Sequence, residues 1–222
     1  MQIGILCAVK EEFEPYLDSL KEKAEMTHAK YTFYSGSLFD KQVVIVHCGI
    51  AKVNAAVATQ ILIDKFGCDF IVLSGTAGGL CPTLRIGDTV VATSVHYHDV
   101  DDHNMIDHFP HAPNAAFLTD TAFAQRAIDN RPYNIVNGAM ACGEYFISGK
   151  QREEIRTKLK AVAVDMESAS VGHTCFINKI PFAVVKSISD CPQNDTQKCF
   201  EENLVLASRN SFDVVGKVLS SL

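Results

Sequence analysis

Short apolar runs alternate with segments of helical spacing along almost the whole chain, and this alternation restricts the possible folds more than any other feature. The runs are rich in Val, Ile, Leu and Ala and are bounded by Gly, Pro or charged residues, as expected of strands buried on both faces. We expect such strands at residues 3–9, 43–48, 70–73, 89–95, 162–164 and 182–185. Apolar residues at i, i+3 and i+4 predict helices at residues 11–23, 52–66, 116–130, 153–159, 168–178 and 200–222.

This order of elements predicts an α/β fold, a three-layer α/β/α sandwich around a central mixed, mostly parallel sheet. Strands joined through helices pair in parallel and need helices on both faces to cover them. Two features add antiparallel pairing. Residues 31–39 and 43–47 are predicted to form a hairpin that turns at Asp40 and Lys41, and the run at 89–95 has no helix before it.

The composition fits a single domain over residues 1–222. A chain of 222 residues with 47% hydrophobic residues can bury one substantial core, and no linker-like segment divides it. The net charge of -6, without a Lys- or Arg-rich run, argues against nucleic acid or an anionic membrane as partner. No apolar stretch reaches the roughly 20 residues of a membrane span, and no basic leader is present, so we expect a cytoplasmic protein. Its eight cysteines, none in a C-x-x-C pair, are expected to be reduced thiols.

Polar side chains follow four of the expected strands. In an open α/β sheet the carboxyl ends of the strands, and the helices that begin there, face one crevice. The residues in question are Lys10, Glu11 and Glu12; the stretch Ser-Gly-Thr-Ala-Gly-Gly at 74–79; Asp165 and Glu167; and Lys186, Ser187, Ser189 and Asp190. We therefore expect a site lined by carboxylates, a lysine, hydroxyls and a glycine turn.

These features also have ordinary structural interpretations. Asp165 and Glu167 precede a helix, where a carboxylate can cap the chain end or interact favourably with the helix dipole. The three glycines lack the G-x-G-x-x-G spacing of a dinucleotide site and fit a tight turn as well as a closely bound flat or sugar-like ligand. A cavity lined by Glu12 and Glu167 repels anions, but it suits sugar hydroxyls and an oxocarbenium-like transition state. The residues thus favour transfer of a glycosyl group to water.

Several segments, in order along the chain, resemble the 5'-methylthioadenosine/S-adenosylhomocysteine nucleosidases of the purine nucleoside phosphorylase superfamily. They are Glu11-Glu12, Gly75-Thr76-Ala77-Gly78-Gly79-Leu80, Gly87-Asp88, Phe146-Ile147, Val164-Asp165-Met166-Glu167 and Ser187-Ile188-Ser189-Asp190. The resemblance implies a homodimeric hydrolase that cleaves the N-glycosidic bond of 5'-thio-substituted adenosines and releases adenine. It implies neither a metal nor another cofactor.

The resemblance also implies roles for individual residues. Glu12 is implied to activate the attacking water, and Asp190, oriented by Ser189, to protonate N7 of the leaving adenine. Burial without a cationic partner is expected to keep Asp190 protonated near neutral pH. The implied substrate contacts are Glu167, Met166 and Thr76 at the ribose, Phe146 and Ile147 at the adenine, and Ile50, Phe200 and the partner subunit's Pro113 around the 5' substituent. At Gly78 the backbone is expected to approach a flat or sugar-like ligand closely.

Two positions depart from the family pattern. Lys186 stands where relatives commonly have arginine, so that a point charge replaces a planar fork near the expected water. Residues 102–110 differ from the aromatic, Gly-containing loop that in relatives closes the neighbouring subunit's 5' pocket, although residues 97–113 are still expected near the partner's active site.

Three other hypotheses stay open. The first is hydrolysis by a bound zinc or manganese ion, because His and Asp residues are concentrated at 96–111. No H-E-x-x-H or comparable metal signature is present, however. A nucleoside phosphorylase would need cationic or Gly-rich phosphate recognition near the first strand, where this chain has Val9, Lys10 and two glutamates. A non-catalytic nucleoside-binding or storage protein would be expected to lack the base or the acid, yet Glu12 and Asp190 are both present.

Overall fold

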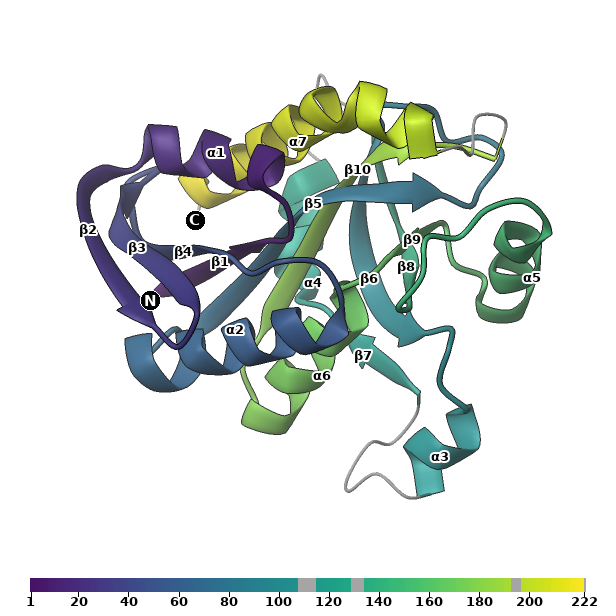
Figure 1. Cartoon of the computed structure of the whole chain (residues 1–222), viewed down its shortest axis with the longest axis horizontal. Helices are drawn as coiled ribbons and strands as arrows, with labels where there is room; N and C mark the ends of the chain where they lie inside the picture. Colours follow the sequence, from purple (N-terminus) through teal and green to yellow (C-terminus); the bar gives the residue numbers. More distant parts are fainter. Residues whose placement is uncertain (108–114, 129–133, 193–196, 222) are drawn as a thin grey trace.

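The computed structural model describes residues 1–107, 115–128, 134–192 and 197–221, in which one sheet is flanked by helices (Figure 1). Its strands are β1 (Ile3–Cys7), β2 (Lys21–His28), β3 (Tyr31–Leu38), β4 (Lys41–His47), β5 (Phe70–Gly79), β6 (Thr89–Tyr97), β7 (Ala116–Leu118), β8 (Ile135–Cys142), β9 (Ala163–Asp165) and β10 (Phe182–Asp190). Its helices are α1 (Lys10–Ser19), α2 (Lys52–Phe66), α3 (Asp102–Asp107), α4 (Thr121–Ile128), α5 (Lys150–Leu159), α6 (Ser168–Asn178) and α7 (Gln197–Ser220).

The sheet is mixed, as predicted, and one end of it closes on itself. The strand order is β10-β6-β8-β9-β5-β1-β4-β3-β2, and β10 also pairs with β5, so that five strands form a ring from which β1 to β4 extend. The pairs β1–β4, β1–β5, β5–β10, β6–β8 and β8–β9 are parallel. The pairs β2–β3, β3–β4, β5–β9, β6–β7 and β6–β10 are antiparallel, so both kinds of pairing are present, as expected.

Helices cover both faces of the sheet, which confirms the three-layer α/β/α sandwich. In Figure 1, α1 and α7 lie above the sheet and α2 and α6 below it. Neighbouring residues of β1 serve the two sides: Ile5 belongs to the core under α1 and α7, and Leu6 to the core under α2 and α6. Each fully buried side chain of this kind contributes about 1.5–3 kcal/mol.

Two predicted helices are shorter than expected, because strands occupy part of their ranges. The helix predicted at 11–23 ends at Ser19, and the chain continues as β2, an edge strand whose residues are all exposed and therefore form no apolar run. The helix predicted at 116–130 begins as β7. Helix α4 starts only after Asp120, whose carboxylate accepts the backbone N–H of Phe123 at 2.7 Å in the manner of an N-cap.

The glycine turn predicted at 74–79 is wrong. These residues are the extended end of β5 and pair with β10 as far as Gly78 and Asp190. The predicted hairpin is confirmed as β3–β4, but it turns one residue earlier, at Phe39 and Asp40, both of which have positive φ. Strand β8 was not predicted, because Asn137 and Gly138 interrupt its apolar residues.

The eight cysteines are free thiols, as predicted, and all but Cys81 are buried. Helices long and apolar enough to cross a membrane are absent from the described part of the chain.

Candidate active site

A cavity opens where β1, β5, β9 and β10 end, as predicted from the polar residues that follow these strands. The predicted site residues that line it are Glu12, Ile50, Thr76, Gly78, Phe146, Ile147, Met166, Glu167, Ser189, Asp190 and Phe200. The rest of the wall is Ala8, Val9, Ala77, Tyr145, Arg152, Val164, Asp165 and Gln197. Lys186 does not line the cavity, and Pro113 lies outside the described residues.

Glu12 is a buried carboxylate held by four hydrogen bonds. It is the third residue of α1, and its Oε2 accepts the backbone N–H groups of Ala8 at 2.8 Å and Val9 at 3.2 Å. Its Oε1 accepts the backbone N–H of Thr76 at 2.7 Å and the Thr76 hydroxyl at 2.9 Å. Since a carboxylate offers about four lone-pair positions, the protein itself occupies all of them.

Gly75 makes room for this carboxylate. A Cβ on Gly75 would fall on the Glu12 carboxylate, so glycine is required here by close approach. The end of β5 therefore supplies the space for the Glu12 carboxyl and, at Thr76, two of its donors.

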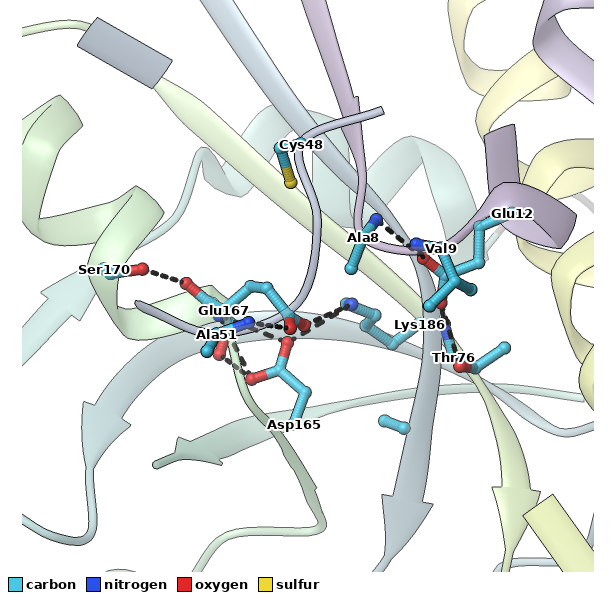
Figure 2. A network of polar contacts seen from close by, with 12 residues as sticks. Ala8, Val9, Glu12, Cys48, Ala51, Thr76, Asp165, Glu167, Ser170 and Lys186 are labelled. Atoms are coloured by element: carbon cyan, nitrogen blue, oxygen red, sulfur yellow. Dashed lines mark hydrogen bonds and ion pairs between the residues drawn. The ribbon is translucent and has the colours of Figure 1, made fainter. Parts of the chain in front are cut away.

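Glu167 lies across the cavity in a buried cluster of charges. Its Oε1 accepts the backbone N–H of Ala51 at 3.0 Å, and its Oε2 lies 3.3 Å from Lys186 Nζ (Figure 2). Lys186 Nζ is also 3.5 Å from the Asp165 carboxylate. Lys186 is thus placed behind Glu167 and Asp165 rather than at the cavity surface.

This cluster changes the acidity of its members. Burial raises the pKa of Glu167, the charge of Lys186 lowers it in part, and Asp165 raises it further. Burial alone would lower the pKa of Lys186, but the carboxylates of Glu167, Glu12 and Asp165 raise it above its ordinary range. Lys186 therefore stays charged and opposes protonation of Glu167.

Asp165 has the structural role that its position suggests, together with a part in this cluster. Its Oδ1 accepts the backbone N–H of Ser168 at 3.1 Å and the Ser168 hydroxyl at 2.6 Å, where α6 begins. The N-cap position itself is Glu167, which uses its side chain for Ala51 and Lys186 instead.

Asp190 ends β10 and is held on both carboxylate oxygens. The Ser189 hydroxyl donates to Oδ1 at 2.8 Å, and the guanidinium of Arg152 contacts Oδ2. Both Asp190 and Arg152 are almost completely buried. The expectation that Asp190 has no cationic partner is therefore wrong.

Apolar side chains form the remaining wall. The rings of Phe146 and Phe200 meet edge to face with their centroids 6.3 Å apart, and Phe146 remains 39% exposed. Half-buried Met166 and exposed Ile50 lie beside the charged cluster. A cavity lined by these apolar side chains and by four carboxylates suits a ligand with one flat, apolar part and one part rich in hydroxyls.

Comparison with known proteins agrees with this geometry. The model of the phosphorylase superfamily matches residues 2–220. A 5'-methylthioadenosine/S-adenosylhomocysteine nucleosidase from an Exiguobacterium species is 36% identical over 231 residues, which covers 100% of this chain and 99% of the relative. The chain belongs to this nucleosidase family.

Two solved structures have nearly the same backbone fold as this chain. The nucleosidase of Colwellia psychrerythraea 34H, in complex with adenine, is 35% identical with a TM-score of 0.89, over 100% of this chain and 96% of that one. A futalosine hydrolase of Helicobacter pylori is 28% identical with a TM-score of 0.91, over 100% and 98%. Because a nucleosidase and a futalosine hydrolase share this backbone, the fold alone does not identify the substrate.

Arg152 is a charged residue of the cavity wall that was not predicted from the sequence. It lies in the first turn of α5, a helix of mostly charged residues, and is the only buried side chain there. A signal does exist: Arg152 is three positions before Ile155 and seven before Leu159, the apolar residues by which α5 packs. It therefore belongs to the inward-facing stripe of the helix.

In the described residues, which include part of the segment rich in His and Asp, no group of three or more His, Cys, Asp or Glu side chains is placed so that it could hold a metal ion. Asp99 is paired with Lys52 at 2.8 Å, and His103 with Asp107 at 2.5 Å. His108 and His111 lie outside the described residues.

Proposed function

We propose that this protein hydrolyses the N-glycosidic bond of 5'-thio-substituted adenosines, such as 5'-methylthioadenosine and S-adenosylhomocysteine, to adenine and the thioribose. One observation carries the proposal: Glu12 and Asp190, two buried carboxylates from different strand ends, line a single cavity together with Glu167. A base for water, an acid for the leaving group and an acceptor for ribose hydroxyls are the groups that this hydrolysis needs.

Glu12 is the proposed base. A water that gives its proton to Glu12 must first replace one of the four donors around the carboxylate. Three of these are backbone N–H groups with fixed directions, whereas the Thr76 hydroxyl can turn about its Cβ–Oγ bond. We therefore assign the water to the position of the Thr76 hydroxyl at Oε1.

Glu167 is the proposed ribose ligand. Ala51 and Lys186 use one lone-pair position on each of its oxygens, which leaves two positions for the 2'- and 3'-hydroxyls. Thr76, Gly78 and the Met166 backbone frame the same part of the cavity.

Asp190 is the proposed acid. The step requires the protonated form of Asp190. As the water oxygen bonds to C1', the C1'–N9 bond breaks, its electrons pass to adenine, N7 accepts the proton of Asp190, and Glu12 takes a proton from the water. Phe146 is proposed to stack on the base and the Ile147 backbone to recognise its edge. Ile50 and Phe200, with the partner subunit's Pro113, are proposed to surround the 5' substituent.

The test is the release of free adenine from a panel of adenosines that differ at the 5' position. We expect 5'-methylthioadenosine and S-adenosylhomocysteine to be cleaved faster than adenosine, because the apolar wall gains contact with the thioether. Each reaction is run with and without phosphate. A requirement for phosphate would identify a phosphorylase instead, and tight binding without adenine release would identify a binding protein.

A futalosine-type nucleoside belongs in the panel, because a hydrolase named for that substrate shares 28% identity with this chain. Preferential cleavage of that compound would mean that the substrate is a futalosine-type nucleoside, although the bond cleaved would still be the N-glycosidic bond.

The decrease of kcat/KM at acidic pH is expected to follow the protonation of Glu167. Burial raises the pKa of this carboxyl to about 7, and only the ionised form accepts hydrogen bonds from both ribose hydroxyls. We expect kcat/KM to fall as the pH drops through this region. Lys186→Met removes a charge that lowers the pKa of Glu167, so its profile should shift to higher pH, whereas Lys186→Arg keeps the charge and should not shift it. Identical profiles for both variants would contradict the assignment.

We also propose that the chain acts in the cytoplasm, as one domain over residues 1–222, and in methionine salvage. A homodimer is proposed because large apolar side chains are exposed on the paired helices α2 and α6, namely Val53, Val57 and Ile177. Light scattering should give twice the 24.3 kDa of one chain. A mass of one chain at micromolar concentration would contradict the dimer.

A further inference from the structure

Arg152 sits where an arginine is unfavourable unless specific partners compensate for it. It is the third residue of α5, and a positive charge in the first turn opposes the helix dipole. It is also only 2% exposed, and a buried cation is costly without good partners. Its position therefore requires an explanation that the α5 sequence alone does not provide.

The guanidinium connects three separate segments at one end of the cavity. Its Nε donates to the Ile147 carbonyl at 3.0 Å, its Nη1 donates to the Gly79 carbonyl at 2.8 Å, and its Nη2 contacts the Asp190 carboxylate. These segments are the loop before α5, the end of β5 and the end of β10. One side chain thus fixes Asp190 relative to the loop proposed to recognise adenine.

Ser189 completes the hold on Asp190. With its hydroxyl on Oδ1 and Arg152 on Oδ2, the carboxyl plane cannot turn about the Cβ–Cγ bond without losing one of the two contacts. We propose that Arg152 is a positioning residue for leaving-group departure: it orients the Asp190 carboxyl toward the purine and holds the Ile147 backbone at the purine edge. This inference rests on the proposed nucleosidase function.

The experiment compares two substrates that share a 5-methylthioribose. One is 5'-methylthioadenosine, whose adenine needs protonation to leave. The other is the 4-nitrophenyl glycoside of the same sugar, the nitrophenyl substrate, whose phenolate leaves without a proton. We expect Arg152→Met to reduce kcat on the nucleoside by about 100-fold, the scale of loss that follows a misplaced catalytic group. Turnover of the nitrophenyl substrate should stay near that of the unmodified protein.

Arg156→Met is the matched control, because Arg156 lies one turn further along α5 and pairs with the exposed Glu153. It should change neither rate. Adding Arg152→Met to Asp190→Asn should cause a smaller loss than Arg152→Met causes in the unmodified protein, since the part of its effect that acts through the Asp190 carboxyl is already gone. If Arg152→Met does not fold, Arg152→Lys is the variant to test. It keeps the positive charge, but one ammonium group cannot bind all three acceptors of the planar guanidinium. It should lose nucleoside turnover selectively.

Equal losses on both substrates would mean that Arg152 only supports the fold, and no loss would mean that it is dispensable; either result overturns the inference. Failure of the proposed function has a different signature, in which the unmodified protein releases adenine from none of the nucleosides.

Discussion

Glu12→Gln is expected to reduce turnover of both 5'-methylthioadenosine and the nitrophenyl substrate by about 10²- to 10⁴-fold, the usual contribution of a positioned general base. Both reactions need an activated water, so the loss should not depend on the leaving group. Initial rates of adenine and nitrophenolate release under saturating substrate give the two numbers directly.

The same substitution should also cost some stability, for a reason visible in the four donors around Glu12. A glutamine can keep its oxygen toward the N–H groups of Ala8 and Val9, and its NH2 can donate to a reoriented Thr76 hydroxyl. The backbone N–H of Thr76 is then left facing another donor. One buried unsatisfied group costs about 1–3 kcal/mol, so a lower melting temperature is expected.

Glu14→Gln is the control for this prediction. It removes the same charge from the same helix at an exposed position, where Glu14 only pairs with Lys10 at 3.2 Å. It should leave both rates unchanged. Near-normal turnover by Glu12→Gln in correctly folded protein would remove Glu12 from the mechanism.

The parts of the fold that the sequence predicted are those whose signals are local. Helices α2 and α6 match their predicted ranges of 52–66 and 168–178, because apolar periodicity marks their length and a left-handed residue, Gly67 or Lys179, follows each end. Strands β1, β4 and β10 are likewise marked by continuous apolar runs. By contrast, β2 and β8 are held by pairing with neighbours, and their own residues form no apolar run.

The candidate site divides in the same way. The strand-end rule brought Glu12, Thr76, Glu167 and Asp190 to one cavity, since each follows a recognisable strand. The partners that come from distant parts of the chain could not be predicted. The Thr76 donors are 64 residues from Glu12, and Arg152 is 38 residues from Asp190. Asp190 was expected to have no cationic partner because residue spacing can locate a carboxylate but cannot show which distant cation the fold places beside it.

Asp190→Asn is expected to separate acid catalysis from every other function of the cavity. The asparagine can turn its oxygen toward Arg152 and its NH2 toward the Ser189 hydroxyl, which then donates to the Ala77 carbonyl 3.3 Å away. The hydrogen bonds of the site survive, but the buried guanidinium of Arg152 loses its carboxylate partner, so a lower melting temperature is expected. The amide cannot deliver a proton to N7, however, and adenine release should fall by about 10²- to 10⁴-fold.

The nitrophenyl substrate distinguishes loss of the acid from loss of the base. Because phenolate leaves without a proton, Asp190→Asn should hydrolyse it at nearly the rate of the unmodified protein, whereas Glu12→Gln should not. The two variants are therefore expected to agree on the nucleoside and to differ on the nitrophenyl substrate. If Asp190→Asn lost both activities equally, Asp190 would have to act on the sugar or the water, and the assignment of acid and base to the two ends of the cavity would have to be reversed or abandoned.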